Sequence, residues 1–105
     1  MPFRLSITRE AAAHLHALSP REQRIVEDAI LARLREQPTT PTRAIKRLRP
    51  NPLAEFELRV GEFRVLYNVE GDEVVLLVVG RKVGNTLIVA GEEFHGHQGD
   101  SAEGA

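Results

Sequence analysis

Three arginines, Arg59, Arg64 and Arg81, are the side chains of this 105-residue chain best suited to chemistry. A guanidinium group is planar, always charged and able to hold a phosphate or carboxylate through two parallel hydrogen bonds. These residues therefore predict a site for an anionic ligand or partner, provided that the fold brings them together.

The segment 56–67 predicts how two of these arginines are held. Apolar and polar residues alternate there on either side of a glycine, which is the pattern of a β-hairpin with one buried face. A two-residue type II′ turn at Gly61–Glu62 sets Arg59 directly opposite Arg64. Like charges opposed across two strands are destabilising. The pair therefore indicates an anionic ligand or partner that relieves the repulsion.

The third arginine follows the apolar run 74–79, which predicts a strand covered on both faces. If this strand continues the register of the hairpin, Glu62 lies opposite Arg81. Side chains alternate between the faces of a strand, so Arg81 then shares a face with Arg59 and Arg64. We expect the three guanidinium groups to converge at one end of a three-stranded sheet.

An ordinary solvated face is the alternative interpretation of these arginines. Acidic neighbours would then neutralise them, namely Glu55, Glu57 and Glu62. In the predicted register only Glu62 lies at the same end of the sheet as the arginines, which favours a binding site.

A second basic group lies in the proline-containing segment 39–54. Four positive charges fall within seven residues that contain no acid, at Arg43, Lys46, Arg47 and Arg49. Short basic runs occur on nucleic-acid-binding surfaces, although they are more often plain solvated surface. The net charge of the chain is only −1, so it is the distribution of charge that indicates a nucleic-acid partner.

Local signals predict a strand at 3–7 followed by two helices. Thr8 suits the N-cap of the first helix. Ser19, Pro20 and Glu22 combine an N-cap, a first-position proline and a capping box, so a second helix should begin there and run to about Glu36. Its expected buried side chains share one face: Ile25, Val26, Ala29, Ile30 and Leu34. With further strands expected around 44–48 and 87–89, the sequence predicts an α+β fold, a strand and helical hairpin packed on a small, mostly antiparallel twisted sheet.

Length and composition limit the remaining possibilities. The chain suits one domain over 1–94, and its polar, glycine-rich tail over 95–105 should be disordered. It has no cysteine, which excludes disulfides and thiolate metal sites. No apolar run reaches the roughly 18 residues that cross a bilayer, and the N-terminus has no signal-type apolar segment. We therefore expect a soluble cytoplasmic protein without membrane contact.

No residue pattern favours a metal or cofactor. His14 and His16 lie two residues apart on a predicted helix and so face different directions. His95 and His97 begin the expected tail. The chain has no nucleophile motif, phosphate-binding loop or dinucleotide fingerprint. We therefore expect neither a metal ion nor a cofactor.

The chain resembles the RelE/ParE superfamily of bacterial type II toxin–antitoxin toxins over about residues 3–94. Three segments carry this resemblance. They are 48–53 (Leu-Arg-Pro-Asn-Pro-Leu), 57–67 (Glu-Leu-Arg-Val-Gly-Glu-Phe-Arg-Val-Leu-Tyr) and 79–85 (Val-Gly-Arg-Lys-Val-Gly-Asn). The order strand, helical hairpin and antiparallel strands is also similar.

The resemblance implies a small toxin that arrests growth until a cognate antitoxin binds it in a hetero-oligomeric complex. Many RelE-like members are endoribonucleases that cut mRNA on the ribosome without metal, by attack of the ribose 2′-hydroxyl on the adjacent phosphate. Arg59, Arg64 and Arg81 would take the catalytic positions. The residues implied to contact the RNA backbone are Lys46, Arg47, Arg49 and Lys82.

One departure from the family pattern concerns proton transfer. Several RNA-cleaving members carry a tyrosine or histidine near the C-terminus for this step. Here residues 91–95 contain no tyrosine, and His95 alone could serve from that end. Two alternatives therefore stay open: a ParE-like DNA gyrase poison without hydrolytic activity, and an inactive module that only binds its antitoxin.

Overall fold

The computed structural model describes residues 2–94. The described elements run in the order β1 (Arg4–Ile7), α1 (Arg9–His16), α2 (Pro20–Leu34), β2 (Ile45–Arg47), β3 (Phe56–Val60), β4 (Phe63–Glu70), β5 (Glu73–Val83), β6 (Thr86–Val89) and β7 (Glu92–Glu93). The expected tail 95–105, with His95 and His97, lies outside the described residues.

The helices begin where the sequence predicts. The Thr8 hydroxyl accepts a hydrogen bond from the Ala11 amide at 3.1 Å. Ser19 and Glu22 form the reciprocal capping box, each side chain accepting from the backbone amide of the other at 3.1–3.2 Å. Such caps satisfy amide groups that have no partner within the helix. Helix α2 ends at Leu34, slightly before the predicted Glu36.

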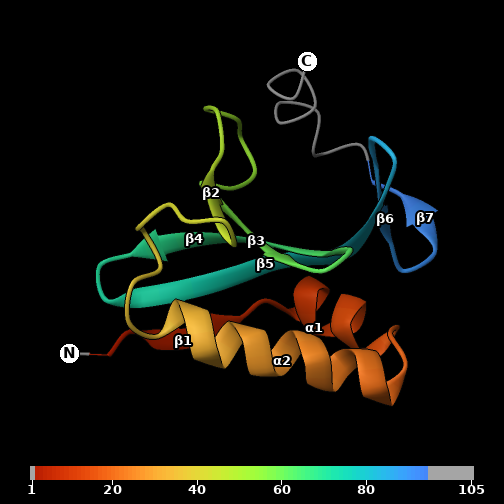
Figure 1. Ribbon diagram of the computed structural model, residues 1–105, viewed down its shortest axis with the longest axis horizontal. Coiled ribbons are helices and arrows are strands. Elements are labelled where there is room, and N and C mark those ends of the chain that lie inside the picture. The colour runs from red at the N-terminus through yellow and green to blue at the C-terminus, as the bar shows by residue number, and fades with distance from the viewer. Residues whose placement is uncertain (1, 95–105) are drawn as a thin grey trace.

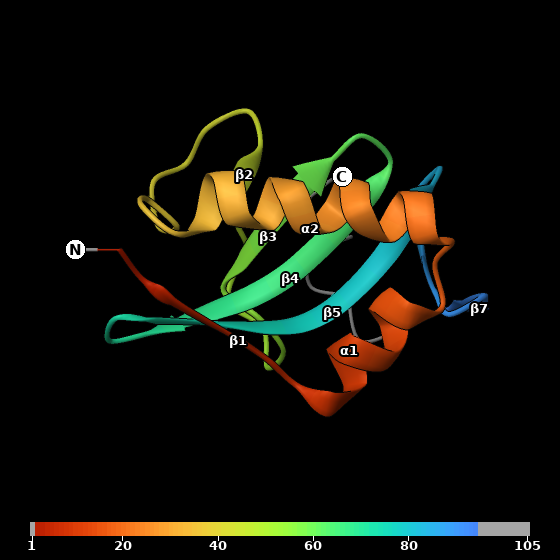
Figure 2. The same ribbon diagram turned by 90° about the horizontal axis from the view of Figure 1, so that it is seen from below.

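The described strands form a seven-stranded sheet in the order β2-β3-β4-β5-β6-β7, with β1 parallel to the first half of β5. Both helices lie on one face of this sheet, where α2 crosses the β3–β4 hairpin and α1 packs beside β5 (Figures 1 and 2). The ends of the sheet, β2 on one side and β6–β7 on the other, rise away from the helices. The predicted α+β class is confirmed.

The larger core lies between the helices and the sheet. Val26, Ile30 and Leu34 are buried along α2, as the helical spacing predicts. Ile25, expected among them, is 43% exposed. It lies next to Val26 in the chain, and an α-helix turns by about 100° per residue, so it points away from the sheet.

A smaller core covers part of the opposite face. Its buried side chains come from the loop after β2 and from β4, β5 and β6: Leu48, Ala54, Leu66, Val78, Leu87 and Val89. This cluster explains why the residues of β4 and β5 are apolar on both faces over part of their length. The sheet face opposite the helices is therefore partly covered by apolar side chains.

The hairpin pairs as predicted, with Arg59 opposite Arg64. Gly61 has a φ of +58°, the left-handed conformation that its predicted place in the turn requires. The next pair of strands departs from the prediction. Val69 lies opposite Val74 as expected, but a β-bulge shifts the register at Leu66, which pairs with Val78.

Candidate functional site

The β-bulge decides which basic side chains share a face. Because one extra residue is inserted in β5, Arg64 lies opposite Gly80 and Phe63 lies opposite Arg81. Arg81 therefore shares the helix-packed face with Phe63. The predicted pairing of Glu62 with Arg81, and with it the convergence of three arginines, is wrong.

The surroundings of Arg81 confirm this placement. Its guanidinium lies 4.9 Å from the centre of the Phe63 ring. Nη2 donates to the Glu22 carboxylate of α2 at 2.8 Å, and Nη1 donates to Glu62 in the hairpin turn. These bonds raise the pKa of Arg81 and lower that of Glu22. Arg81 thus joins the helix layer to the hairpin.

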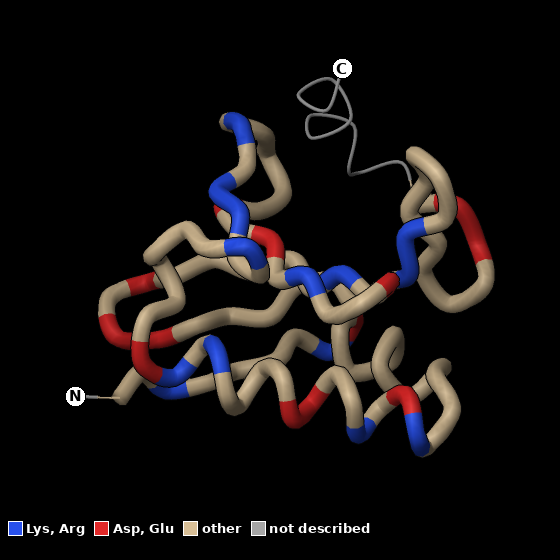
Figure 3. The backbone as a smooth tube through the Cα atoms, in the orientation of Figure 1, with Lys and Arg blue, Asp and Glu red and all other residues tan. Residues whose placement is uncertain are grey.

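The other sheet face carries a different set of basic residues, and we call it the helix-free face. Arg59 and Arg64 come from the hairpin. Lys82 shares this face with Gly80 by alternation along β5, and it pairs with the buried Leu87 of the smaller core. Lys46 lies opposite Glu57 across β2 and β3. Figure 3 shows basic positions running from β2 along the hairpin to the end of β5.

Arg64 is folded back onto its own turn. Nη1 donates to the carbonyl oxygens of Gly61 and Phe63, both at 2.8 Å. Its Nε is buried and has no hydrogen-bond partner among the described residues. A buried donor without an acceptor is costly, so the folded-back conformation of Arg64 leaves one of its donors unsatisfied.

Arg59 is held by an acidic residue of the same strand. Its Nε donates to Oε1 of Glu57 at 3.2 Å, and the Glu57 side chain has no solvent exposure. Acidic side chains therefore do engage two of the arginines, Glu57 at Arg59 and Glu62 at Arg81. The acidic neighbours considered in the alternative interpretation thus pair with these two arginines, although the two pairs lie on opposite faces of the sheet.

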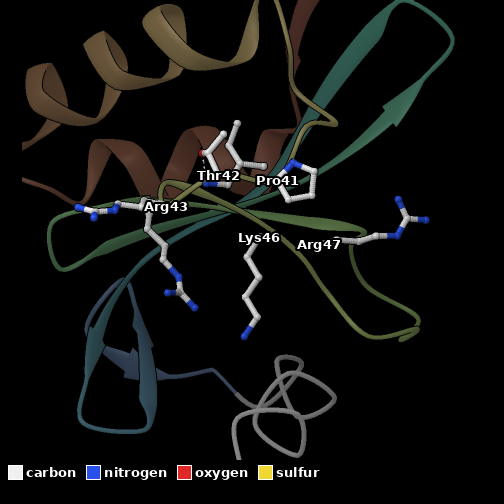
Figure 4. Close-up of a pocket in the computed structure, with 7 residues that line it drawn as sticks. Pro41, Thr42, Arg43, Lys46 and Arg47 are labelled. Atoms are coloured by element: carbon white, nitrogen blue, oxygen red, sulfur yellow. Dashed lines mark hydrogen bonds between the residues drawn. The ribbon is translucent and has the colours of Figure 1, made fainter.

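A hollow of about 620 Å³ adjoins Arg59 at the β2 end of the face. Its lining is largely basic and polar: Pro41, Thr42, Arg43, Ile45, Lys46, Arg47 and Arg59. In Figure 4 Lys46 extends away from the helices, whereas Arg47 points in a different direction. The Arg47 guanidinium lies 5.2 Å from the Phe56 ring, and Arg49 is exposed in the loop beyond β2.

A family model, the ParE toxin of type II toxin–antitoxin systems, matches residues 5–82. The chain belongs to this family. Among solved structures, a chain of the toxin–antitoxin complex RelBE2 from Mycobacterium tuberculosis is 30% identical, with a TM-score of 0.68, and the match covers 78% of this chain and 100% of that one. A comparison with curated protein sequences finds no match. The predicted membership of the RelE/ParE superfamily is confirmed.

The described face of this toxin holds few groups that could transfer a proton. Tyr67 lies on the opposite face, where its hydroxyl donates to the Pro38 carbonyl at 2.6 Å and burial raises its pKa. His14 and His16 belong to α1.

Among residues 2–94, no three acidic or histidine side chains gather as a metal site requires. No helix in this part of the chain is long and apolar enough to span a membrane.

The sequence anticipated most of the basic residues of the toxin's helix-free face but not their grouping. Arg59, Arg64, Lys46 and Lys82 share that face, and Arg81 and Arg47 do not. Glu57, the buried acid among them, was expected only as a possible neutralising residue. The sequence did contain a signal that Glu57 lies beside Arg59. The two residues are two positions apart in a strand, and their side chains therefore lie on the same face.

Proposed function

We propose that this type II toxin inhibits translation by cutting ribosome-associated mRNA without a metal ion, with the helix-free face as its RNA-binding surface. The observation that carries the proposal is the register at the bulge, which gathers Arg59, Arg64 and Lys82 on a sheet face that no helix covers. The ends of the sheet rise away from the helices on this side of the molecule (Figure 1), and we propose that an extended strand of RNA lies across this face. Basic side chains bind its backbone irrespective of sequence.

In the proposed reaction the ribose 2′-oxygen forms a bond to the adjacent phosphorus, and the bond from phosphorus to the 5′-oxygen breaks. The products are a 2′,3′-cyclic phosphate and a 5′-hydroxyl end. Arg64 and Arg59 stabilise the extra charge on the phosphate oxygens in the transition state. The 2′-hydroxyl proton needs an acceptor and the leaving 5′-oxygen a donor, and His95 is the residue that we propose for this step.

Substitution of Arg64 tests the proposal. Arg64→Ala should lower transcript cleavage by about 10²–10³-fold, the usual cost of removing one transition-state donor. Arg64→Lys should restore little activity, because an ammonium group cannot offer two parallel donors. The measurement is primer extension on a reporter mRNA after induction, together with growth curves and thermal melts of each variant.

The matched control is Arg24→Ala, which removes the same charge from the exposed, helix-covered side of the protein. It should leave cleavage and growth arrest unchanged. Full cleavage by Arg64→Ala would refute the proposed site.

A gyrase poison without hydrolytic activity is the second candidate. Two observations favour it: the matching family model is that of a ParE toxin, and the described part of the helix-free face holds no histidine or tyrosine. On this hypothesis growth arrest occurs with intact transcripts and with activated DNA-damage signalling. The same induction experiment therefore separates the two candidates.

The antitoxin provides a further test of the same face. We propose that an acidic, extended antitoxin segment covers the helix-free face in a hetero-oligomeric complex, because the face is basic and open. Reversing the charge at Lys82 and Arg59 should then weaken capture of the product of the neighbouring gene in a co-expression pull-down. Unchanged capture would place the antitoxin elsewhere.

A further inference from the structure

Glu57 is the one charged side chain that is fully buried among the described residues. It lies on the helix-free face of β3, between Lys46 on one neighbouring strand and Leu66 on the other. Burying a carboxylate is costly unless it is paired and hydrogen-bonded. A sheet built for stability alone would place an apolar residue here, next to the smaller core.

The contact of Glu57 with Arg59 indicates what this residue does. Its Oε1 accepts from Nε of Arg59 at 3.2 Å. A guanidinium held at Nε keeps its two terminal nitrogens for another acceptor. The Arg59 side chain is 39% exposed, so these nitrogens can meet a ligand while the buried carboxylate restricts their motion.

We propose that Glu57 is a positioning residue that orients Arg59 toward an RNA phosphate. The inference rests on the proposed function, since it assumes that RNA binds the helix-free face. Glu57 is not the base of the reaction, because a side chain without solvent exposure cannot reach the 2′-hydroxyl. It acts through Arg59, and its value lies in restricting a long, flexible side chain before RNA binds.

Simple electrostatics predicts the opposite effect. A carboxylate on a basic face repels phosphate, so removing it should strengthen RNA binding. Orientation of Arg59 predicts weaker binding when the acceptor oxygen is lost. The sign of the change therefore discriminates the two explanations.

The experiment measures binding of a short single-stranded RNA oligonucleotide to the full chain by fluorescence anisotropy. Glu57→Leu removes the acceptor and should weaken binding about tenfold, as expected for the loss of one charge-assisted contact. Glu57→Gln keeps an oxygen acceptor of the same length, so it should bind at least as tightly as the wild type. If the leucine variant does not fold, Glu57→Asp replaces it, because its shorter carboxylate cannot reach Nε of Arg59.

A double variant shows whether Glu57 acts through Arg59. Arg59→Ala should weaken binding to a similar degree and reduce the slope of log K against log salt by about 0.7, the effect of one phosphate on single-stranded nucleic acid. Glu57→Leu should add nothing to Arg59→Ala, whereas independent effects would add.

Three results would overturn the inference: unchanged or tighter binding by Glu57→Leu, equal losses in the leucine and glutamine variants, or additive losses in the double variant. Failure of the proposed function would look different. In that case Arg59→Ala itself would leave both the RNA affinity and the salt slope unchanged, and the RNA-binding face would be wrong together with the role of Glu57.

Discussion

Arg59 and Arg64 lie opposite each other, as the alternation of the hairpin predicts, and the folded protein lessens their repulsion in two ways. Arg59 is bound to the buried carboxylate of Glu57, and Arg64 donates to two carbonyl oxygens of its own turn. The unbound protein can therefore tolerate a pair that would otherwise be unfavourable. If RNA binds this face as proposed, its phosphate would meet an Arg59 side chain that Glu57 already holds.

At the same scale, His14 makes the stability of the protein sensitive to pH. Its Nδ1 accepts a hydrogen bond from the backbone amide of Val79 at 3.3 Å, so the neutral ring fits the fold. Burial lowers the pKa of His14 below its ordinary 6.5, and Glu10 opposes part of that shift. A lowered pKa means that this contribution to stability is complete above pH 6.5 and is lost as the pH falls through the lowered value.

We therefore expect acidification to destabilise the wild type more than His14→Gln, whose amide oxygen can accept the same bond without titrating. Melting temperatures of both proteins between about pH 7 and pH 5 measure this difference. Parallel curves would show that His14 makes no such contribution. Differences caused by the other histidines cancel, because both proteins carry them.

At the scale of elements, local sequence signals were enough to predict the helices and the hairpin. Thr8, Ser19 and Pro20 mark helix starts through interactions within a few residues, and Gly61 marks the turn. No local sequence signal marks the bulge. Its extra residue is Leu77, which has no partner in β4 and belongs to an unbroken apolar run. Its position follows from packing against cores on both faces, which the sequence of one strand does not reveal.

The consequences of that one element reach the candidate site. A single inserted residue exchanged the faces of Arg81 and Lys82, because side chains alternate with a period of two. The types of residue in the site were predictable from the sequence, but their grouping depended on a pairing between distant strands. The short strand β7 was also missed, since the two residues Glu92–Glu93 are too few for a pattern.

Gly80 tests the pairing of β5 with β6. A methyl group at this position would lie 2.8 Å from the Ile88 carbonyl oxygen and 2.9 Å from a Val89 methyl. Gly80→Ala should therefore force the strands apart and lower the free energy of unfolding by about 1–3 kcal/mol, the usual cost of overpacking. The measurement is a denaturant melt.

Gly84→Asn is the control for this variant. Gly84 has a φ of +62° and nothing within 4 Å of an added Cβ, and asparagine tolerates the left-handed conformation. It should change stability far less than Gly80→Ala. Equal losses would mean that glycine conformation, not crowding by β6, explains the effect.

At the scale of the whole molecule, the two faces of the sheet differ in the residues that they carry. The larger core and both helices cover one face, whereas Arg59, Arg64, Lys46 and Lys82 occupy the other. If RNA binds the helix-free face as proposed, a substitution on the helix-packed side should change stability without changing RNA affinity. Arg81 is the best residue with which to test this difference between the faces. The sequence alone placed it in the site, whereas the structure places it between the helices and the sheet.

Arg81→Gln should lower the melting temperature at neutral pH by a few degrees while leaving RNA affinity and transcript cleavage unchanged. The reason is the loss of its bonds to Glu22 in α2 and to Glu62 in the hairpin turn. The bond to Arg81 lowers the pKa of Glu22 from its ordinary 4.5. Its contribution is thus complete above pH 4.5 and disappears as the pH falls through the lowered value, so the two melting temperatures should converge in acid. Lost cleavage with an unchanged melting temperature would instead return Arg81 to the catalytic role that the sequence suggested.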